Sequence, residues 1–274
     1  MPVEFDQQKL ELALKAGRED ENLPFSLHIF DSLASTNQTL WNLLAQGEKP
    51  WSVVIARQQT AGRGQWGRQW ISPTGGLYLS VAIAPKLEAT ASYQLTLASA
   101  WGIASQLRQC GVDVGIKWPN DLVLNGRKLG GILTETKINN GYIIQAVIGV
   151  GINWTNPVPE TGINLERWQA SRPTKPISCL EILTSVVLQG LQSGMECLYQ
   201  EGISILLSRY LELLSNMGDK VYIDNLVGTV VGVTSVGKLR VSLETYDTTE
   251  IKTPELYIEP GTITLGYSKS SVSL

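Results

Sequence analysis

The chain has 274 residues, of which 43% are hydrophobic and 17% are charged, a composition that fits a folded globular protein and excludes wholesale disorder. The formal net charge is −3, so nothing supplies a surface that neutralises nucleic-acid phosphates, and nucleic acid is not an expected partner. Three scattered cysteines and one histidine, His28, exclude a disulfide framework, a thiolate metal cage and a multi-histidine zinc site.

The N-terminal segment carries charge throughout. Residues 1–20 contain no apolar core of a signal peptide, and no run of 18 apolar residues occurs in the chain, so we expect a cytoplasmic protein without a membrane span. Residues 6–16 predict a short amphipathic helix whose leucines pack on the main body. We expect residues 1–24 to form an extension that is too short for a helix-turn-helix domain.

The body of the protein begins at residue 25 with alternating helices and strands. Ser35 and Gln38 have the spacing of a capping box and precede leucines at helical spacing, which predicts the start of a helix. The next predicted elements are a short buried strand at 53–56, a loop without apolar periodicity at 57–76, a strand at 77–83 and a buried helix at 93–108.

Two predicted hairpins determine the fold class. Asn125-Gly126 separates strands at 121–124 and 127–129, and the run 139–141 (Asn-Asn-Gly) separates strands at 132–137 and 142–150. Such turn sequences are typical of β-hairpins. Consecutive hairpins indicate an α+β protein with an antiparallel or mixed sheet rather than a doubly wound parallel sheet.

The last third of the chain changes from helices to short strands. Ser178 and Glu181 have capping-box spacing and predict helices at 178–198 and 201–214. Short strands are predicted at 220–223, 228–234, 239–243 and 249–253, and together they favour a small β-barrel. We therefore expect one domain at 25–217 and a small β domain at 218–274.

The loop at 57–76 is the first segment that suggests chemistry. It carries Arg57, Arg63 and Arg68 without an acid nearby in the sequence, together with glycines 62, 64 and 67. Glycines let backbone N–H groups approach a ligand, and unopposed arginines favour an anionic one. A flexible surface loop with solvated arginines is an equally good interpretation of the spacing. The spacing excludes a P-loop and a dinucleotide-binding fingerprint.

A second segment combines lysines with oxygen donors. Pro119 imposes a rigid turn after Lys117, and Asn120 and Asp121 offer oxygens suited to a Mg²⁺-bound phosphate, with Lys128 following in the hairpin. By residue type alone, an ordinary turn with two exposed lysines is the favoured interpretation.

A third segment, Gly149-Val150-Gly151-Ile152-Asn153, ends an apolar strand. Its small residues allow close backbone approach, and Asn153 could present a donor and an acceptor to a base edge. A β-bulge with a strand exit is the favoured interpretation of this segment by itself.

The three segments occur together and in order. The matching pieces are Ser-Thr-Asn-Gln at 35–38, QTAGRG at 59–64 with Gly67-Arg68, KWPND at 117–121, KLGGIL at 128–133 and GVGIN at 149–153. This ordered set, over roughly residues 30–270, resembles the biotin protein ligases. The resemblance implies a mixed sheet related to the core of class II aminoacyl-tRNA synthetases, with an SH3-like C-terminal barrel. It also implies that biotin and ATP are substrates, with Mg²⁺, and that the biotin carboxyl carrier domain of acetyl-CoA carboxylase is the partner.

The resemblance implies roles for individual residues. The catalytic ones would be Arg63, Lys117, Asp121 and Lys128. Biotin would contact Ser35, Thr36, Asn37, Gln59, Gly62, Arg63, Gly64, Gln65, Lys128, Gly130 and Gly131. ATP would contact Arg63, Arg68, Lys117, Asn120, Lys128, Asn153 and Trp154, and Mg²⁺ would be held by Asn120 and Asp121. Because Arg63 and Lys128 would offset the repulsion between the biotin carboxylate and the α-phosphate, both must face one site. We expect the loop at 57–76 to close over the ligand.

Two departures from the family pattern modify these expectations. Many members have arginine where this chain has Gln65, which places retention of the adenylate in question. The first residues are too few and too acidic for the DNA-binding domain of the family's repressors, so we expect a monofunctional ligase. His28 lies outside every motif, which favours a structural or surface role.

Other functions stay open beside this one. A lipoate ligase or octanoyltransferase shares the implied fold but lacks the QTAGRG and KWPND combination. A biotin-responsive binding protein without catalysis is the alternative from another class. The residues also leave a homodimer as one option for assembly.

Overall fold

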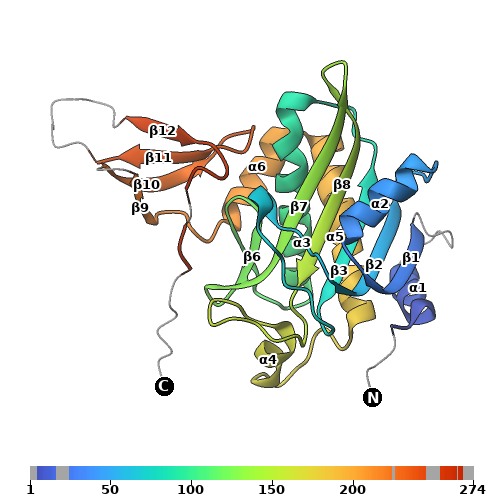
Figure 1. The fold of residues 1–274 in the computed structure, drawn as a ribbon. Helices are drawn as coiled ribbons and strands as arrows, with labels where there is room; N and C mark the ends of the chain where they lie inside the picture. The colour runs from blue at the N-terminus through green and yellow to red at the C-terminus, as the bar shows by residue number, and fades with distance from the viewer. Residues whose placement is uncertain (1–4, 17–24, 224–225, 245–253, 264, 268–274) are drawn as a thin grey trace.

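The computed structural model describes residues 5–16, 25–223, 226–244, 254–263 and 265–267. Its largest element is a mixed eight-stranded sheet (Figure 1), in which seven strands follow the order β1-β2-β3-β8-β7-β6-β5 and β4 pairs with β8. β1 and β2 are parallel, whereas the other neighbours are antiparallel. The bounds are β1 Ser26–Leu33, β2 Ser52–Gln59, β3 Leu77–Ile83, β4 Leu87–Glu88, β5 Gly115–Lys117, β6 Asp121–Leu124, β7 Arg127–Asn139 and β8 Tyr142–Ile152. The predicted α+β fold with a mixed sheet is confirmed.

Both predicted hairpins are present in this sheet. Asn125 and Gly126 join β6 to β7 with φ angles of 50° and 68°, and Asn140 and Gly141 join β7 to β8 with φ angles of 49° and 79°. Asparagine and glycine tolerate this left-handed region better than other residues, so local turn chemistry accounts for both connections.

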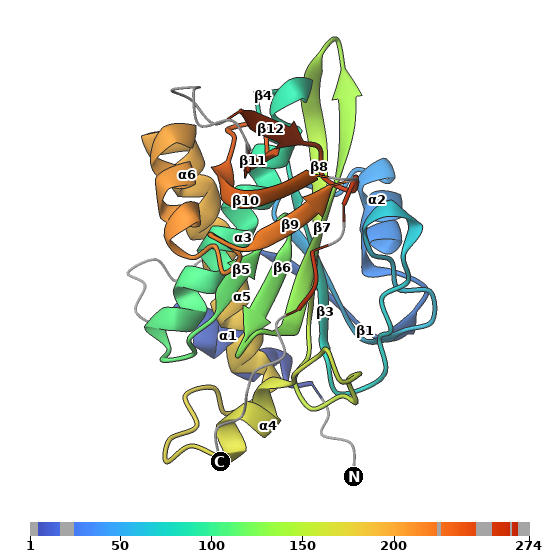
Figure 2. The same ribbon diagram turned by 90° about the vertical axis from the view of Figure 1, so that its left-hand side faces the viewer.

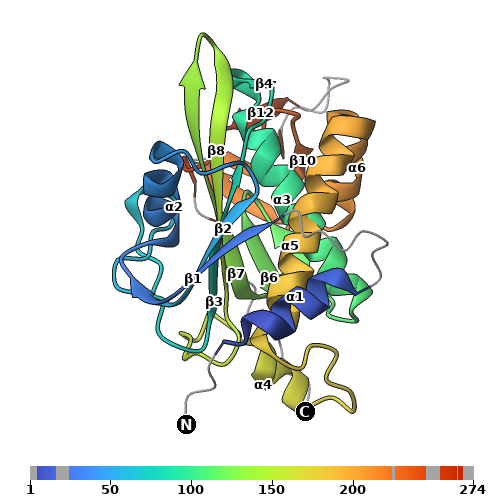
Figure 3. The same ribbon diagram turned by 90° about the vertical axis from the view of Figure 1, so that its right-hand side faces the viewer.

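Helices cover the two faces of the sheet (Figure 3). α3 (Ser92–Gln109) and α5 (Leu180–Glu196) lie on one face, and α2 (Thr36–Ala45) lies on the other. α3 and α5 pack with their backbones close together, because a Cβ on Gly102 would lie 2.0 Å from the carbonyl oxygen of Gly190. The remaining α-helices are α1 Gln7–Lys15, α4 Leu165–Ala170 and α6 Ile203–Glu212.

The N-terminal helix packs on the body as predicted. Leu10 and Leu14 on α1 are fully buried, and α1 lies against α5. The backbone N–H of Asp6 donates to the carboxylate of Glu181 over 2.9 Å, which ties the start of α1 to the first turn of α5. The predicted connector at 17–24 lies outside the described residues.

The two predicted capping boxes are wrong in detail. Ser35 is the N-cap of α2, but its side chain makes no capping bond, and Gln38 donates to Asn42 over 3.2 Å instead. α5 begins after Cys179, one residue later than the predicted cap at Ser178. The polar groups expected to cap the helices have other partners: Gln38 bonds to Asn42 in the same helix, and Glu181 accepts from the backbone of Asp6.

The C-terminal strands form a separate four-stranded antiparallel sheet in the order β12-β11-β10-β9. Its bounds are β9 Lys220–Ile223, β10 Leu226–Val233, β11 Leu239–Leu243 and β12 Glu255–Ile258. The described residues thus form a small β domain as an open sheet, and the predicted strand at 249–253 lies outside them. Figure 2 shows this sheet in front of β6 and β7. The indole N–H of Trp118 donates to the carbonyl of Gly237 over 2.8 Å and joins the two sheets.

Among the residues with described structure, no helix combines the length and the apolar character needed to cross a membrane.

Candidate active site

One cavity of about 290 Å³ gathers most of the predicted site residues. Its wall comes from the start of α2, the end of β2, the loop at 57–76, the β6–β7 hairpin, β8 and the C-terminal segment. The predicted residues that line it are Ser35, Thr36, Asn37, Gln59, Arg63, Gly64, Gln65, Arg68, Lys117, Asn120, Asp121, Lys128 and Gly131. Arg63 and Lys128 therefore face one site, as the prediction requires.

The charge of this wall is strongly biased. Of the described residues that line the cavity, four are cationic (Arg63, Arg68, Lys117 and Lys128) and one is acidic (Asp121). A cavity lined by one sign of charge concentrates ligands of the opposite sign. The geometry therefore suits an anionic ligand.

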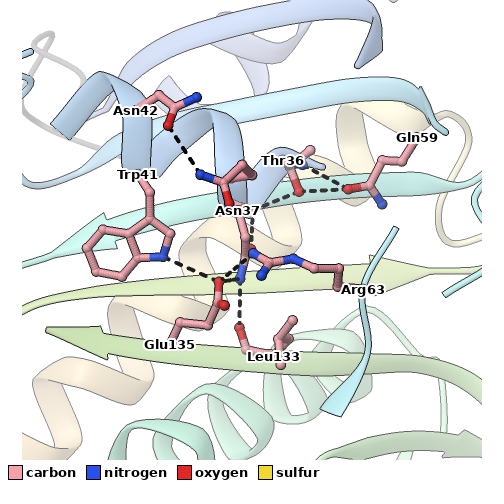
Figure 4. A network of polar contacts seen from close by, with 10 residues as sticks. Thr36, Asn37, Trp41, Asn42, Gln59, Arg63, Leu133 and Glu135 are labelled. Atoms are coloured by element: carbon pink, nitrogen blue, oxygen red, sulfur yellow. Dashed lines mark hydrogen bonds and ion pairs between the residues drawn. The ribbon is translucent and has the colours of Figure 1, made fainter. Parts of the chain in front are cut away.

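Buried polar side chains form one end of the cavity (Figure 4). The backbone N–H and the hydroxyl of Thr36 lie 2.9 and 3.2 Å from the Gln59 side-chain oxygen. The Gln59 amide then donates to the hydroxyl of Ser72 over 2.9 Å. Since these bonds hold the end of β2 against the start of α2, the orientation of both polar groups is set before a ligand binds.

The carboxamide of Asn37 is fully engaged within the protein. Its Nδ2 donates to Glu135 over 2.7 Å and reaches the Leu133 carbonyl at 3.5 Å, while its Oδ1 lies 2.6 Å from the hydroxyl of the buried Ser80. Asn37 is only 3% exposed. It forms part of the wall, and its hydrogen-bonding groups serve the protein itself.

The expectation that the loop arginines lack an acidic partner is wrong. Arg63 pairs with Glu135 at 2.9 Å, and Arg57 pairs with Asp31 at 3.1 Å. Both acids are far from the loop in sequence and are brought to it by β7 and β1. Arg68 lies with its guanidinium 5.9 Å from the centre of the Trp66 ring.

The lysines of the β5–β7 region occupy the other end of the cavity. The Lys128 amine lies 2.6 Å from Oδ1 of Asp121. Lys117 is 7% exposed, and its burial lowers the pKa of its amine to about 8. The amine donates to the carbonyl of Leu265 and lies 3.4 Å from the centre of the Tyr267 ring.

The C-terminal segment closes this end of the cavity. The hydroxyl of Tyr267 donates to Oδ2 of Asp121, and burial raises the pKa of that hydroxyl. Gly261, Ile263 and Leu265 also line the cavity. The sequence does not indicate this contribution, because nothing in the local pattern of residues 261–267 points to a long-range contact.

The Mg²⁺ ligands implied by the resemblance are adjacent on the wall. Asn120 donates its side-chain N–H to the Ile132 carbonyl over 2.6 Å, which orients the amide, and Asp121 supplies a carboxylate. Mg²⁺ is often held by one or two carboxylates together with substrate phosphates, so this donor set fits a metal that arrives with a nucleotide. The described residues contain no group of three or more histidine, cysteine or acidic side chains placed to hold a metal by themselves.

Four predicted residues do not line the cavity: Gly62, Gly130, Asn153 and Trp154. The Asn153 side chain donates to the Lys128 carbonyl at 3.4 Å and accepts from Asn156 at 2.9 Å, and Trp154 is 9% exposed within the core. These two residues therefore shape the turn after β8, and the geometry gives no support to their predicted contact with adenine.

The glycines of β8 lie against side chains of the cavity wall. A Cβ on Gly149 would lie 2.3 Å from Oδ1 of Asn37, and a Cβ on Gly151 would lie 2.5 Å from Nε1 of Trp70. These glycines make room for two side chains of the cavity wall. Both glycines also line the cavity, so a close approach of their backbone to a ligand stays a prediction.

Residues 29–153 match the model of the Biotin/lipoate A/B protein ligase family. The bifunctional ligase/repressor BirA of Escherichia coli is 34% identical over 209 residues, which cover 76% of this chain and 63% of that protein. The biotin--[acetyl-CoA-carboxylase] ligase of Paracoccus denitrificans is 39% identical over 123 residues, which cover 43% of this chain and 50% of that one. The chain thus spans less than two thirds of the length of these relatives.

A solved structure shows the same fold. The biotin protein ligase of Aquifex aeolicus in complex with biotin and ATP has a TM-score of 0.65 and 22% identity, and the match covers 84% of this chain and 95% of that chain. The shared fold and the cationic cavity agree with the match of residues 29–153 to a protein-ligase family. Residues 29–153 are a domain of the Biotin/lipoate A/B protein ligase family, and the resemblance to the biotin protein ligases is confirmed.

Proposed function

We propose that the chain is a biotin protein ligase. In this reaction biotin and MgATP give biotinyl-5′-adenylate and pyrophosphate. The biotinyl group then passes to a lysine of the carrier domain of acetyl-CoA carboxylase, and AMP is released. The observation that carries the proposal is the cavity wall, where four cations face one acid. The names of the relatives support the same chemistry.

The charge of the wall matches the difficulty of the first step. The biotin carboxylate must attack the α-phosphate of ATP, so two anions have to approach each other. Arg63 and Lys128 offset this repulsion and stabilise the charge of the transition state. Loss of one such preorganised donor typically costs ~3–4 kcal/mol of transition-state stabilisation. The step needs no protein nucleophile.

The two ends of the cavity suit the two substrates. We assign the end formed by Thr36 and Gln59 to the biotin ring system, because a ureido group needs paired donors and acceptors in a concave site. Further biotin contacts are proposed for Ser35, Arg63, Gly64, Gln65, Lys128 and Gly131. The other end would take the ATP phosphates on Arg68 and Lys117, with Asn120 and Asp121 holding the Mg²⁺ that polarises them.

The finer architecture is part of the same proposal. We propose a catalytic domain at 25–217 related to the class II aminoacyl-tRNA synthetase core and an SH3-like domain at 218–274. The change from the large sheet to the β9–β12 sheet after residue 217 supports this division.

Mass analysis of a carrier domain tests the proposal directly. A biotin carboxyl carrier domain incubated with the chain, biotin and MgATP should gain one biotinyl group. Lys128→Ala should abolish the gain. Lys137→Ala, which removes an exposed lysine on the same strand β7, should leave it unchanged and serves as the matched control.

The alternative functions give different outcomes in this assay and in measurements of biotin binding and pyrophosphate release. A lipoyl group added to its own carrier domain, with no reaction of biotin, would indicate a lipoate ligase. Binding of biotin without pyrophosphate release would indicate a binding protein. Full activity of Lys128→Ala would show that the catalytic site lies elsewhere.

A further inference from the structure

Glu135 collects hydrogen bonds from separate parts of the chain. Its Oε2 accepts from Nδ2 of Asn37 at 2.7 Å, from Nη2 of Arg63 at 2.9 Å and from Nε1 of Trp41 at 3.3 Å (Figure 4). We propose that Glu135 is a positioning residue for adenylate formation, which holds the Arg63 guanidinium at the cavity before substrates bind. The proposal rests on the proposed ligase function.

The strand β7 explains why Glu135 reaches these groups. Successive residues of a strand alternate between its faces, so Gly131, Leu133 and Glu135 share one face. Gly131 and Leu133 line the cavity, whereas Glu135 lies one step beyond them and is not part of its wall. Glu135 would therefore act on the substrate through Arg63.

The exposure of the ion pair argues against a purely structural purpose. The side chain of Arg63 is 41% exposed and that of Glu135 is 28% exposed, and ion pairs of this kind contribute little to folding stability. The pair does, however, attach the loop at 57–76 to strand β7 through the contact of Arg63 with Oε2 of Glu135.

The guanidinium can serve Glu135 and a ligand together. It has five N–H donors in a rigid planar arrangement, and the bond to Glu135 uses one of them. Arg63 can therefore keep its bond to Glu135 while its other N–H groups donate to the biotin carboxylate and the α-phosphate of ATP. Because the loop is then ordered before binding, less conformational entropy is lost when the substrates meet.

The same carboxylate fixes the neighbouring wall. Asn37 is held between Glu135 and Ser80, so its amide cannot rotate without losing both partners. Glu135 thus sets the relation between the start of α2 and the loop, which form two sides of the biotin end of the cavity.

Glu135→Gln tests this proposal because it keeps the shape and an acceptor but removes the charge. The rate of biotin-dependent ATP–pyrophosphate exchange should fall about tenfold, since the bond to Arg63 is no longer charge-assisted. In an Arg63→Ala background the same substitution should change the rate less than about twofold, because its effect passes through Arg63. The melting temperature should stay within about 4 °C of wild type, as expected for an exposed ion pair.

Asp31→Asn is the matched control. It also removes the charge of an acid paired with an arginine at this loop, but Arg57 does not line the cavity. Its exchange rate should equal that of wild type.

Limited trypsin digestion without ligands gives a readout that does not depend on activity. Cleavage after Arg63 should be faster in Glu135→Gln than in wild type or Asp31→Asn. If wild type shows no exchange, the proposed function fails while digestion still tests the positioning of Arg63. Equal rates of cleavage after Arg63 in Glu135→Gln and wild type would overturn the proposal. So would the same fall of about tenfold in exchange rate when Glu135→Gln is added to Arg63→Ala. A melting temperature lowered by more than about 4 °C would overturn it as well, because Glu135 would then be a structural residue.

Discussion

Replacing Lys117 with methionine should stabilise the fold at neutral pH while removing catalysis. Lys117 is 7% exposed, and burial lowers the pKa of its amine from the ordinary 10.5 to about 8. A lysine whose pKa is lower in the folded state destabilises that state whenever it is protonated. This loss of unfolding free energy is fully present below pH 8, and it disappears as the pH rises toward 10.5.

The size of the effect follows from the two pKa values. The difference between 10.5 and about 8 corresponds to about 3 kcal/mol of unfolding free energy at pH 7. The variant also lacks the hydrogen bond of the Lys117 amine to the Leu265 carbonyl and its contact with the Tyr267 ring. The loss of these two contacts reduces the gain in stability. We therefore expect Lys117→Met to be more stable than wild type by about 1–3 kcal/mol at pH 7.

Urea unfolding at several pH values measures this difference. The advantage of the variant should shrink by about 2 kcal/mol between pH 7 and pH 10, because wild type loses its penalty in that range. Groups that titrate equally in both proteins cancel in the comparison. Lys137→Met, at an exposed position of β7, should show no such pH dependence. An advantage that stays constant with pH, or a variant less stable at pH 7, would refute the reasoning.

Three further predictions concern the two ends of the cavity. In Gly149→Ala the new Cβ would lie 2.3 Å from Oδ1 of Asn37. We expect a loss of ~1–3 kcal/mol in unfolding free energy and a higher KM for biotin in the exchange assay. An unchanged KM would show that biotin binding does not depend on the position of Asn37. Gln65→Arg adds a positive charge to the wall and should slow adenylate release, which stopped-flow or filter binding can measure; identical off-rates in the two proteins would contradict this. Tyr267→Phe removes the hydroxyl that donates to Asp121 and should lower the KM for ATP, because the carboxylate no longer has to leave that partner; a higher KM would mean that Tyr267 helps to bind the nucleotide.

Local sequence patterns predicted the parts of this protein that depend on neighbouring residues. The two asparagine–glycine turns adopt the left-handed angles that their chemistry favours, and they determine the antiparallel order β6-β7-β8. The family pattern also predicted that the arginine loop and the lysine hairpin would face one site, and Arg63 and Lys128 do line one cavity.

The electrostatic partners could not be predicted in the same way. Glu135 is 72 residues from Arg63, and Tyr267 is 146 residues from Asp121. No spacing rule connects residues at these separations, because their contact depends on the register of β7 in the sheet and on where the C-terminal segment returns to the body. For the same reason, the sequence did not indicate that Asn153 bonds with Lys128 and Asn156 in the turn after β8, and its contact with a nucleotide stays a prediction.

The sequence by itself therefore determined the class of fold, the turns and the types of side chain that the site contains. Only the tertiary structure decided which of these side chains are already paired, since pairing depends on the distances that packing creates between remote segments. It assigned the space beside Gly149 and Gly151 to Asn37 and Trp70, and it brought a C-terminal tyrosine to the lysine end of the cavity. Turn preferences act over a few bonds, whereas the fit of packed side chains depends on the whole fold.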